Sequence, residues 1–178
     1  MHAREDNPEL IAAKEKGIPV FSFPEFIFEK SKNKQRIVIA GSHGKTTITA
    51  IILHVLKHIN KEVDFLVGAQ IAGFDNMVRL SETAPTIIIE GDEYFASPLD
   101  KQPKFLKYQH HIALVSGVSW DHINVYPTLD NYVRQFDKLA DATPKGGILI
   151  YNEEDDITSV ICKKARTDVW NKPYKTHA

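Results

Sequence analysis

The chain of 178 residues is long enough for one domain, or for one domain with a piece of another. Its formal net charge of -1 at pH 7 indicates no broad electrostatic attraction to nucleic acid or to a membrane surface. The single cysteine, Cys162, excludes an internal disulfide, and no apolar run approaches the roughly 20 residues that span a bilayer. The N-terminus lacks the apolar segment of a secretion signal, so we expect a cytoplasmic protein. The composition leaves the oligomeric state open.

The first 35 residues differ in pattern from the rest of the chain. Asn7 and Pro8 predict a short helix that ends at Gly17, and residues 18–21 predict a short apolar strand. The polar, lysine-rich stretch 29–36 resembles a linker. Because one helix and one strand do not enclose a core, we expect residues 1–35 to be the end of a preceding domain and residues 36–178 to be the main domain.

From residue 36 onward, apolar strands alternate with amphipathic helices. The strands are predicted at 37–40, 86–89, 112–115 and 148–151, and the helices at 48–59, 130–141 and 157–165. Strands that are apolar throughout are typical of a parallel sheet covered on both faces. We therefore predict an α/β fold with a mostly parallel sheet and helices on both faces. In such sheets, ligands bind at the carboxyl ends of the strands.

Seven residues between the first predicted strand and helix of this region form the strongest motif. They are Gly41, Ser42, His43, Gly44, Lys45, Thr46 and Thr47. Glycines let the backbone approach a phosphate, and the free amides of a helix N-terminus bind anions. We expect a P-loop in which Lys45 reaches the outer phosphates of ATP and the Thr46 hydroxyl binds Mg²⁺. The simpler alternative is a turn that needs glycine only for its shape, but it does not explain Gly-Lys-Thr-Thr at the start of an amphipathic helix.

Acidic residues follow the second apolar strand of this region. Glu90 ends the strand, where a P-loop enzyme places its metal-binding carboxylate. Asp92 and Glu93 are expected to act on the metal through water or to orient other groups. A solvated acidic loop is the alternative interpretation.

Asp121 and His122 follow the strand at 112–115 and should face the same sheet edge as Glu90. A neutral imidazole binds metals, and a neighbouring carboxylate fixes its tautomer. We therefore predict that Glu90 and His122 share one cation site. A polar loop without a ligand is an equally simple interpretation of this pair.

The remaining histidines and the cysteine are weaker candidates. His54 and His58 lie one helical turn apart, which is a metal-ligand spacing, but they stand among lysines and are predicted to be solvated or half-buried. His110 and His111 are predicted to lie on the surface. Cys162 is predicted to be a small core residue.

Together these motifs resemble those of the Mur ligase family, ATP-dependent enzymes that form amide bonds in peptidoglycan synthesis. The family's Gly-Thr-His-Gly-Lys-Thr-Thr is matched by residues 41–47, with Ser42 in place of threonine, and its Glu-Ala-Asp-Glu by residues 90–93. Its Asp-His pair followed by tyrosine is matched by Asp121, His122 and Tyr126.

The resemblance implies roles for these residues. Lys45, Glu90 and His122 would be catalytic, the seven P-loop residues would bind ATP, and Thr46, Glu90 and His122 would hold Mg²⁺. The ATP γ-phosphoryl group would pass to a carboxylate to give an acyl phosphate, which an amine then attacks.

Within the family, the histidine before Gly-Lys-Thr resembles members that act on UDP-N-acetylmuramate. Tyr94, Lys104 and Tyr108 resemble the branch that attaches a peptide, called murein peptide ligase. The alternative amine substrate is L-alanine. A nucleotide-dependent switch or assembly module, which forms no amide, is the alternative of another class.

The sequence also departs from the family pattern. Gly117 and Ser119 replace the usual asparagine and acidic residue, and Phe136 stands where several relatives carry a carbamylated lysine. The family's C-terminal domain, which binds the amine substrate, has no counterpart in residues 1–178, so we expect this chain alone to be inactive as a ligase.

Overall fold

A seven-stranded sheet organises the fold in the computed structural model, which describes residues 3–175. The strand order is β3-β2-β4-β1-β7-β8-β9, and every neighbouring pair is parallel except β2 with β3. The strands are β1 (Gln35–Ala40), β2 (Asp64–Leu66), β3 (Val78–Arg79), β4 (Thr86–Glu90), β7 (Ile112–Val115), β8 (Ile148–Asn152) and β9 (Trp170–Tyr174). The predicted α/β class with a mostly parallel sheet is confirmed.

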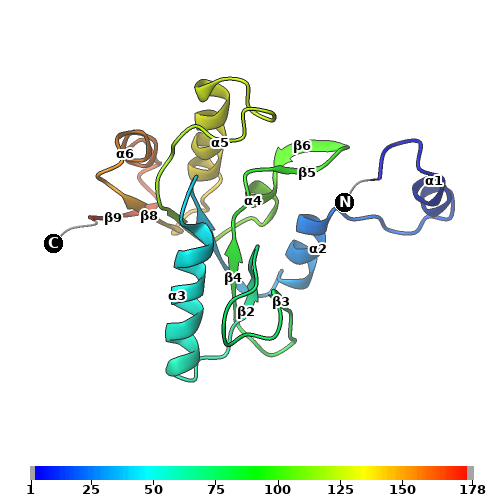
Figure 1. Ribbon diagram of the computed structural model, residues 1–178, viewed down its shortest axis with the longest axis horizontal. Helices are drawn as coiled ribbons and strands as arrows, with labels where there is room; N and C mark the ends of the chain where they lie inside the picture. Colours follow the sequence, from blue (N-terminus) through cyan, green and yellow to red (C-terminus); the bar gives the residue numbers. More distant parts are fainter. Residues whose placement is uncertain (1–2, 176–178) are drawn as a thin grey trace.

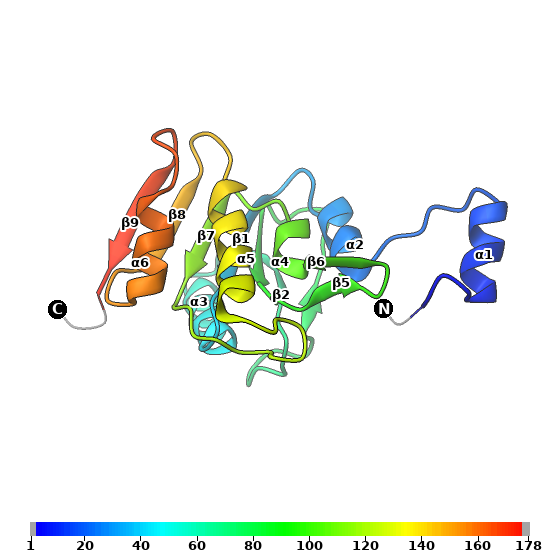
Figure 2. The same ribbon diagram turned by 90° about the horizontal axis from the view of Figure 1, so that it is seen from above.

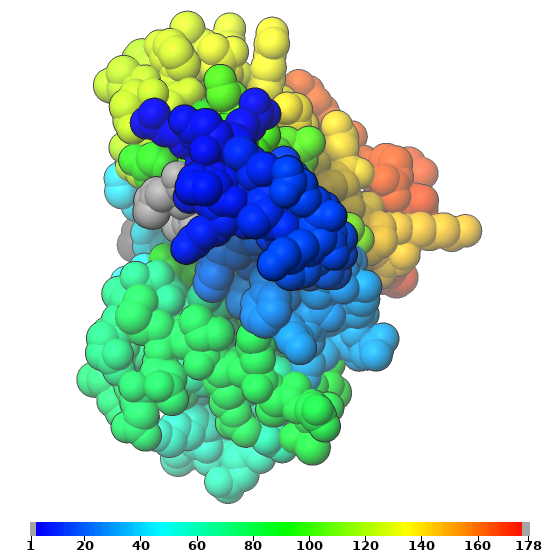
Figure 3. Space-filling model, turned by 90° about the vertical axis from the view of Figure 1, so that its right-hand side faces the viewer, coloured from blue at the N-terminus to red at the C-terminus, as the bar shows by residue number. Residues whose placement is uncertain are grey.

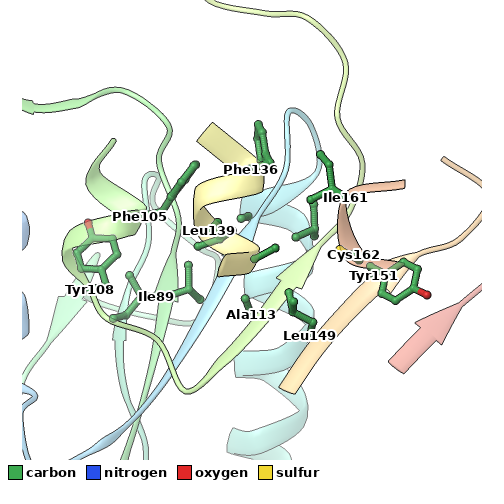
Figure 4. Packing of buried hydrophobic residues seen from close by; sticks show 14 of the residues in the cluster. Ile89, Phe105, Tyr108, Ala113, Phe136, Leu139, Leu149, Tyr151, Ile161 and Cys162 are labelled. Atoms are coloured by element: carbon green, nitrogen blue, oxygen red, sulfur yellow. The ribbon is translucent and has the colours of Figure 1, made fainter. Parts of the chain in front are cut away.

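Helices cover both faces of this sheet, as predicted. One face packs against α3 (Lys45–His58), and the other packs against α2 (Phe23–Lys30), α4 (Lys104–Lys107), α5 (Leu129–Asp141) and α6 (Asp156–Lys163) (Figure 2). The two hydrophobic clusters follow the alternation of strand side chains, since Ile39 lies with α3 whereas Val38 lies on the opposite face. The larger cluster packs Phe136 and Leu139 of α5 near Ala113 and Leu149 of the strands (Figure 4).

The α3 helix buries only part of its apolar surface. Leu53 is buried against the sheet, but Ile51, Val55 and Ile59 are each more than half exposed. The single broad apolar face that the sequence predicts is therefore divided between the core and the outside.

The N-terminal segment agrees with the sequence analysis only in part. The first predicted helix is confirmed as α1 (Pro8–Glu15), with the Asn7 side chain accepting a hydrogen bond from the Leu10 amide at 3.0 Å. The strand predicted at 18–21 is wrong, because these residues are an irregular connection. In Figure 1 this connection holds α1 away from the sheet, and in Figure 3 the blue N-terminal atoms lie in front of the main body.

The linker predicted at 29–36 is also wrong, because these residues include the end of α2 and the start of β1. The α2 helix begins with a capping-box pair, in which Glu25 Oε2 accepts a hydrogen bond from the Ser22 amide at 2.8 Å. Its Ile27 is only 1% exposed and belongs to the larger cluster of the sheet. The α2 helix therefore packs as part of the main domain.

Several short elements have no clear pattern in the sequence. They are β2, β3, β9, α4 and the hairpin of β5 (Phe95–Ser97) and β6 (Asp100–Pro103). The β2, β3, β5 and β6 strands have two to four residues and no run of β-branched apolar residues, and β9 is polar because it is an edge strand. Within residues 3–175, no helix is long and apolar enough to cross a membrane.

Candidate active site

The predicted P-loop lies between β1 and α3, at the carboxyl edge of the sheet. Gly44 precedes α3 with a φ of 80°, and Gly41 has a φ of 131°. A Cβ atom on Gly41 would lie 2.1 Å from the Ser116 Oγ, so glycine is required there for space as well as for conformation. Among residues 3–175, no side chain caps the N-terminus of α3, which leaves its first amides available to an anion.

The loop after β7 is fastened to the P-loop by hydrogen bonds. The Ser42 amide donates to the Gly117 carbonyl at 2.9 Å, and the Ser119 amide donates to the Ser42 Oγ at 2.7 Å. The Ser116 hydroxyl donates to the His43 carbonyl at 2.8 Å. Ser42 and Ser119 thus contact each other, and both stand where the family pattern has another residue.

Lys45 is the first residue of α3, and its ammonium group is held by oxygen atoms on several sides. Its Nζ donates to the Gly41 carbonyl at 2.7 Å and to the Ser42 carbonyl at 3.1 Å. It also lies 3.0 Å from Oε2 and 3.2 Å from Oε1 of Glu93. The positive charge of Lys45 is therefore fixed beside the P-loop backbone, where a phosphate would bind.

Thr46 and Glu90 form a pair of oxygen groups next to Lys45. The Thr46 hydroxyl donates to Glu90 Oε1 at 2.7 Å, and the Gly68 amide donates to Glu90 Oε2 at 2.8 Å. Gly68 follows β2 and has little room for a side chain, since a Cβ there would lie 3.1 Å from Glu90. The strand-end carboxylate thus lies beside the hydroxyl that is expected to bind Mg²⁺.

Glu93 is the centre of the site, and its side chain is only 1% exposed. Its Oε1 lies 2.9 Å from His122 Nε2 and 3.1 Å from the Tyr132 hydroxyl. The Tyr126 hydroxyl donates to the Glu93 backbone carbonyl at 2.5 Å. Within the described residues, Oε2 accepts no hydrogen bond of good geometry, so its contact with Lys45 is an ionic one.

His122 adopts an uncommon backbone conformation, with a φ of 55°. Such values in a non-glycine residue cost energy and are concentrated at functional sites. The imidazole contacts Glu93 on one side and the Tyr94 ring on the other, with ring centroids 4.3 Å apart. Asp121 contributes less than predicted to orienting it, because its Oδ1 lies 3.8 Å from Nδ1.

The side chains converge on one cavity of about 640 Å³. Its wall includes the predicted catalytic residues Lys45, Glu90 and His122. Asp92, Glu93, Tyr94, Lys104 and Tyr108 also line it, together with Phe23 from α2. Of the seven predicted P-loop residues, only Lys45 lines this wall, and two of the others have side chains turned to solvent. The His43 side chain is 75% exposed and lies 4.0 Å from Asp121, and Thr47 is exposed.

The donor groups fit Mg²⁺, which prefers carboxylate and hydroxyl oxygens and retains several waters. Thr46 and Glu90 supply such oxygens side by side. Residues 3–175 contain no group of three or more His, Cys, Asp or Glu side chains placed to hold a metal ion together. The residues present would thus hold the ion with few protein ligands, as is usual when substrate phosphates complete the coordination.

Sequence reasoning did not identify Tyr132, which faces Glu93 from α5, or Gly68, which binds Glu90. Tyr132 occupies an ordinary apolar position of an amphipathic helix, so its pattern is that of a core residue. For Glu93 the sequence predicted only a general orienting role, because this residue comes three positions after the end of β4.

The other histidines do not contribute to this site. His54 and His58 are exposed, as predicted. The surface position predicted for His110 is wrong, because it is 2% exposed and its Nε2 lies 2.9 Å from the Thr143 hydroxyl. Burial, with smaller effects of His111 and Arg36, lowers the pKa of His110 to about 4. Cys162 is a fully buried core residue, as predicted.

The fold and this cavity define a P-loop α/β domain. Residues 39–178 match the model of the Mur ligase middle domain. The chain therefore belongs to the Mur ligase family, whose members are ATP-dependent ligases that form amide bonds.

This chain is similar to a ligase named for L-alanine and to a ligase named for a peptide. The UDP-N-acetylmuramate–L-alanine ligase of Clostridium botulinum (strain Langeland) is 36% identical over 166 residues, which cover 92% of this chain and 34% of the relative. The structure of the UDP-N-acetylmuramate:L-alanyl-gamma-D-glutamyl-meso-diaminopimelate ligase of Neisseria meningitides has a TM-score of 0.82 at 26% identity, covering 97% of this chain and 55% of that one.

A third similar protein is the UDP-N-acetylmuramate–alanine ligase of Thermotoga maritima. Its structure has a TM-score of 0.68 at 24% identity and covers 89% of this chain and 35% of that one, which supports the fold. The chain thus spans about a third of the length of the curated relatives.

Proposed function

We propose that the full-length protein is an ATP-dependent ligase that joins an amine to the carboxylate of UDP-N-acetylmuramate. The observation that carries the proposal is the convergence of Lys45, Glu90 and His122 on one cavity at the carboxyl edge of the sheet. Family membership and the names of the relatives support the reaction type and the UDP-N-acetylmuramate substrate.

The positions of the residues assign them different roles in this reaction. Lys45 and the amides of residues 41–47 would bind the phosphates of ATP. Thr46 and Glu90 would hold one Mg²⁺, which supplies neutralising charge when bound, and Glu90 and His122 would face a second. The γ-phosphoryl group would pass to the muramate carboxylate, after which the amine attacks the acyl carbon and phosphate leaves.

We propose a peptide as the source of the amine. The support is Tyr94, which contacts the His122 ring and lines the cavity, where the family's L-alanine ligases typically have serine. The α4 helix follows Tyr94 after the β5–β6 hairpin, and its first residue, Lys104, and its C-cap, Tyr108, line the same wall.

L-Alanine is the second candidate. The observation that favours it is the 36% identity to a UDP-N-acetylmuramate–L-alanine ligase over nearly the whole chain, against 26% for the peptide-adding ligase.

The domain division also stays a proposal. We propose that residues 1–35 include the end of a domain that binds the UDP-sugar, with residues 36–178 in the ATP-binding domain. The separation of α1 from the sheet supports this division, and the packing of Ile27 in the larger cluster favours a junction before α2 over one at residue 36 (Figure 1).

The test is product formation by the full-length protein with ATP, Mg²⁺, UDP-N-acetylmuramate and either L-alanine or the tripeptide L-alanyl-γ-D-glutamyl-meso-diaminopimelate. We expect a mass-spectrometric product with tripeptide and none with Lys45→Ala, which should also lose ATP binding in calorimetry. A product with L-alanine alone would select the second candidate. ATP hydrolysis that needs no UDP-N-acetylmuramate and gives no amide would indicate a nucleotide switch and contradict the proposal.

A further inference from the structure

We infer that Tyr132 is a positioning residue for this reaction, because its hydroxyl group joins the P-loop to Glu93, which in turn holds Lys45 and His122. The inference rests on the proposed function. It concerns a side chain that contacts neither ATP nor the acceptor carboxylate in that proposal.

Tyr132 is fixed by the core of the domain. It lies in the first turn of α5, is 0% exposed, and packs edge-to-face against Tyr126 and Phe136. Its hydroxyl lies 3.0 Å from the Ser42 Oγ and 3.1 Å from Glu93 Oε1. The hydroxyl therefore connects two segments that are 51 residues apart in the chain, and both contact Lys45.

The chemistry of these groups sets the direction of the hydrogen bonds. Beside the Lys45 ammonium, Glu93 is ionised and accepts hydrogen bonds only. The single hydroxyl proton of Tyr132 is thus donated to Glu93 Oε1. The Ser42 hydroxyl donates to the Tyr132 oxygen, while the Ser42 Oγ accepts from the Ser119 amide.

The same logic orients His122. Because Glu93 Oε1 accepts, the His122 Nε2 carries a proton and donates it over 2.9 Å. The Nδ1 of a neutral ring then has its lone pair free. The unusual backbone conformation of His122 brings the ring to Glu93, and Tyr132 prevents that carboxylate from rotating away.

A structural role alone would not require the hydroxyl group. Two neighbours in the same cluster, Phe105 and Phe136, are phenylalanines that are at most 1% exposed. A phenylalanine at position 132 would keep the ring packing and lose only the connection from Ser42 to Glu93.

The test compares Tyr132→Phe with Tyr151→Phe in the full-length protein. Tyr151 is a buried tyrosine of the same cluster, and its ring lies on β8, outside the cavity. We expect Tyr132→Phe to lower kcat about tenfold, the effect of one hydrogen bond to a charged group, with the KM for ATP changed less than twofold. Tyr151→Phe should retain the wild-type kcat.

A second comparison asks whether Tyr132 acts through Glu93. In a Glu93→Gln background, adding Tyr132→Phe should lower kcat less than twofold, because the carboxylate it positions is already absent. ¹⁵N spectra of histidine-labelled protein, with the His122 signals assigned from His122→Gln, should show a proton on Nε2 in the wild type and a mixture of tautomers in Tyr132→Phe.

The outcomes are distinguishable. A wild-type protein without amide product refutes the proposed function, and the inference falls with it. In an active wild type, the inference alone is overturned if Tyr132→Phe has normal kcat, if its effect is undiminished in the Glu93→Gln background, or if the His122 tautomer does not change.

Discussion

Replacing Lys45 with alanine should destabilise the fold as well as abolish ATP binding. The ammonium is the only charged partner of Glu93 Oε2, an atom that accepts no hydrogen bond of good geometry within residues 3–175. Its loss would leave a carboxylate oxygen buried without a partner. Breaking a fully buried ion pair costs about 3–5 kcal/mol, and leaving one neutral group unsatisfied costs about 1–3 kcal/mol.

The expected cost for Lys45→Ala lies within the lower of these two ranges, at about 2 kcal/mol. His122 and Tyr132 continue to hold Oε1, and the His122 side chain is 22% exposed, which lets water approach the carboxylate. Alanine is also a slightly better helix former than lysine, and removing a positive charge from the first turn of α3 gains a few tenths of a kcal/mol. A loss of about 2 kcal/mol corresponds to a melting temperature lower by roughly 4–8 °C in a chain of this size.

Urea unfolding of the 178-residue chain, followed by circular dichroism, measures this difference. Adding Glu93→Gln to Lys45→Ala should recover more than half of the loss, because an amide carries no charge to bury, while ATP binding stays absent. If Lys45→Ala unfolds at the wild-type urea concentration, or if Glu93→Gln deepens the loss, the carboxylate is not stabilised by Lys45 as the geometry indicates.

Three further predictions concern other parts of the chain. The pKa of His110 is lowered to about 4 in the folded state, so the unfolded chain binds a proton first as the pH falls. The free energy of unfolding should therefore drop by roughly 3 kcal/mol from pH 6.5 to pH 4. Urea titrations at each pH measure this drop, which should vanish in His110→Gln. Gly41→Ala should destabilise by at least about 2 kcal/mol because of its contact with Ser116, more than Gly146→Ala, which meets no atom within 4 Å, and equal melting temperatures would contradict this. Burial raises the pKa of the Cys162 thiol to about 12. A thiol reagent at pH 8 should therefore label the chain only as fast as the chain unfolds, whereas immediate labelling would show that the thiol is exposed.

The central elements of the fold could be predicted because their apolar patterns are distinct. The β1, β4, β7 and β8 strands are apolar runs, and α3, α5 and α6 are amphipathic over two or more turns. The sequence pattern does not predict α2, because its apolar and polar residues are mixed and residues 29–36 resemble a polar linker. The capping box of Ser22 and Glu25 was the available signal, because it marks a helix start directly.

The candidate site was predictable where it depends on local sequence. Residues 41–47 need no tertiary information, because strand, glycine turn and helix follow one another. The contacts of Glu93 depend instead on how α5 packs across the sheet, which no local period encodes. His110 shows the same limit, since its hydrogen-bond partner Thr143 lies 33 residues further along the chain.

Glu90 and Glu93 differ in their surroundings because β4 ends at Glu90, between the two side chains. Glu90 is paired in register with Ile39 and continues the side of the strand that carries Ile88, the face covered by α3, so it meets Thr46. Gly91 follows, and a Cβ there would lie 2.7 Å from Val38, so the chain passes close to β1 as it leaves the sheet. Glu93 then turns into the space beneath α5, where burial requires partners and Lys45, His122 and Tyr132 provide them. A carboxylate at the strand edge is open to a metal, whereas one enclosed by an ammonium, an imidazole and a phenol is suited to fixing the positions of those groups.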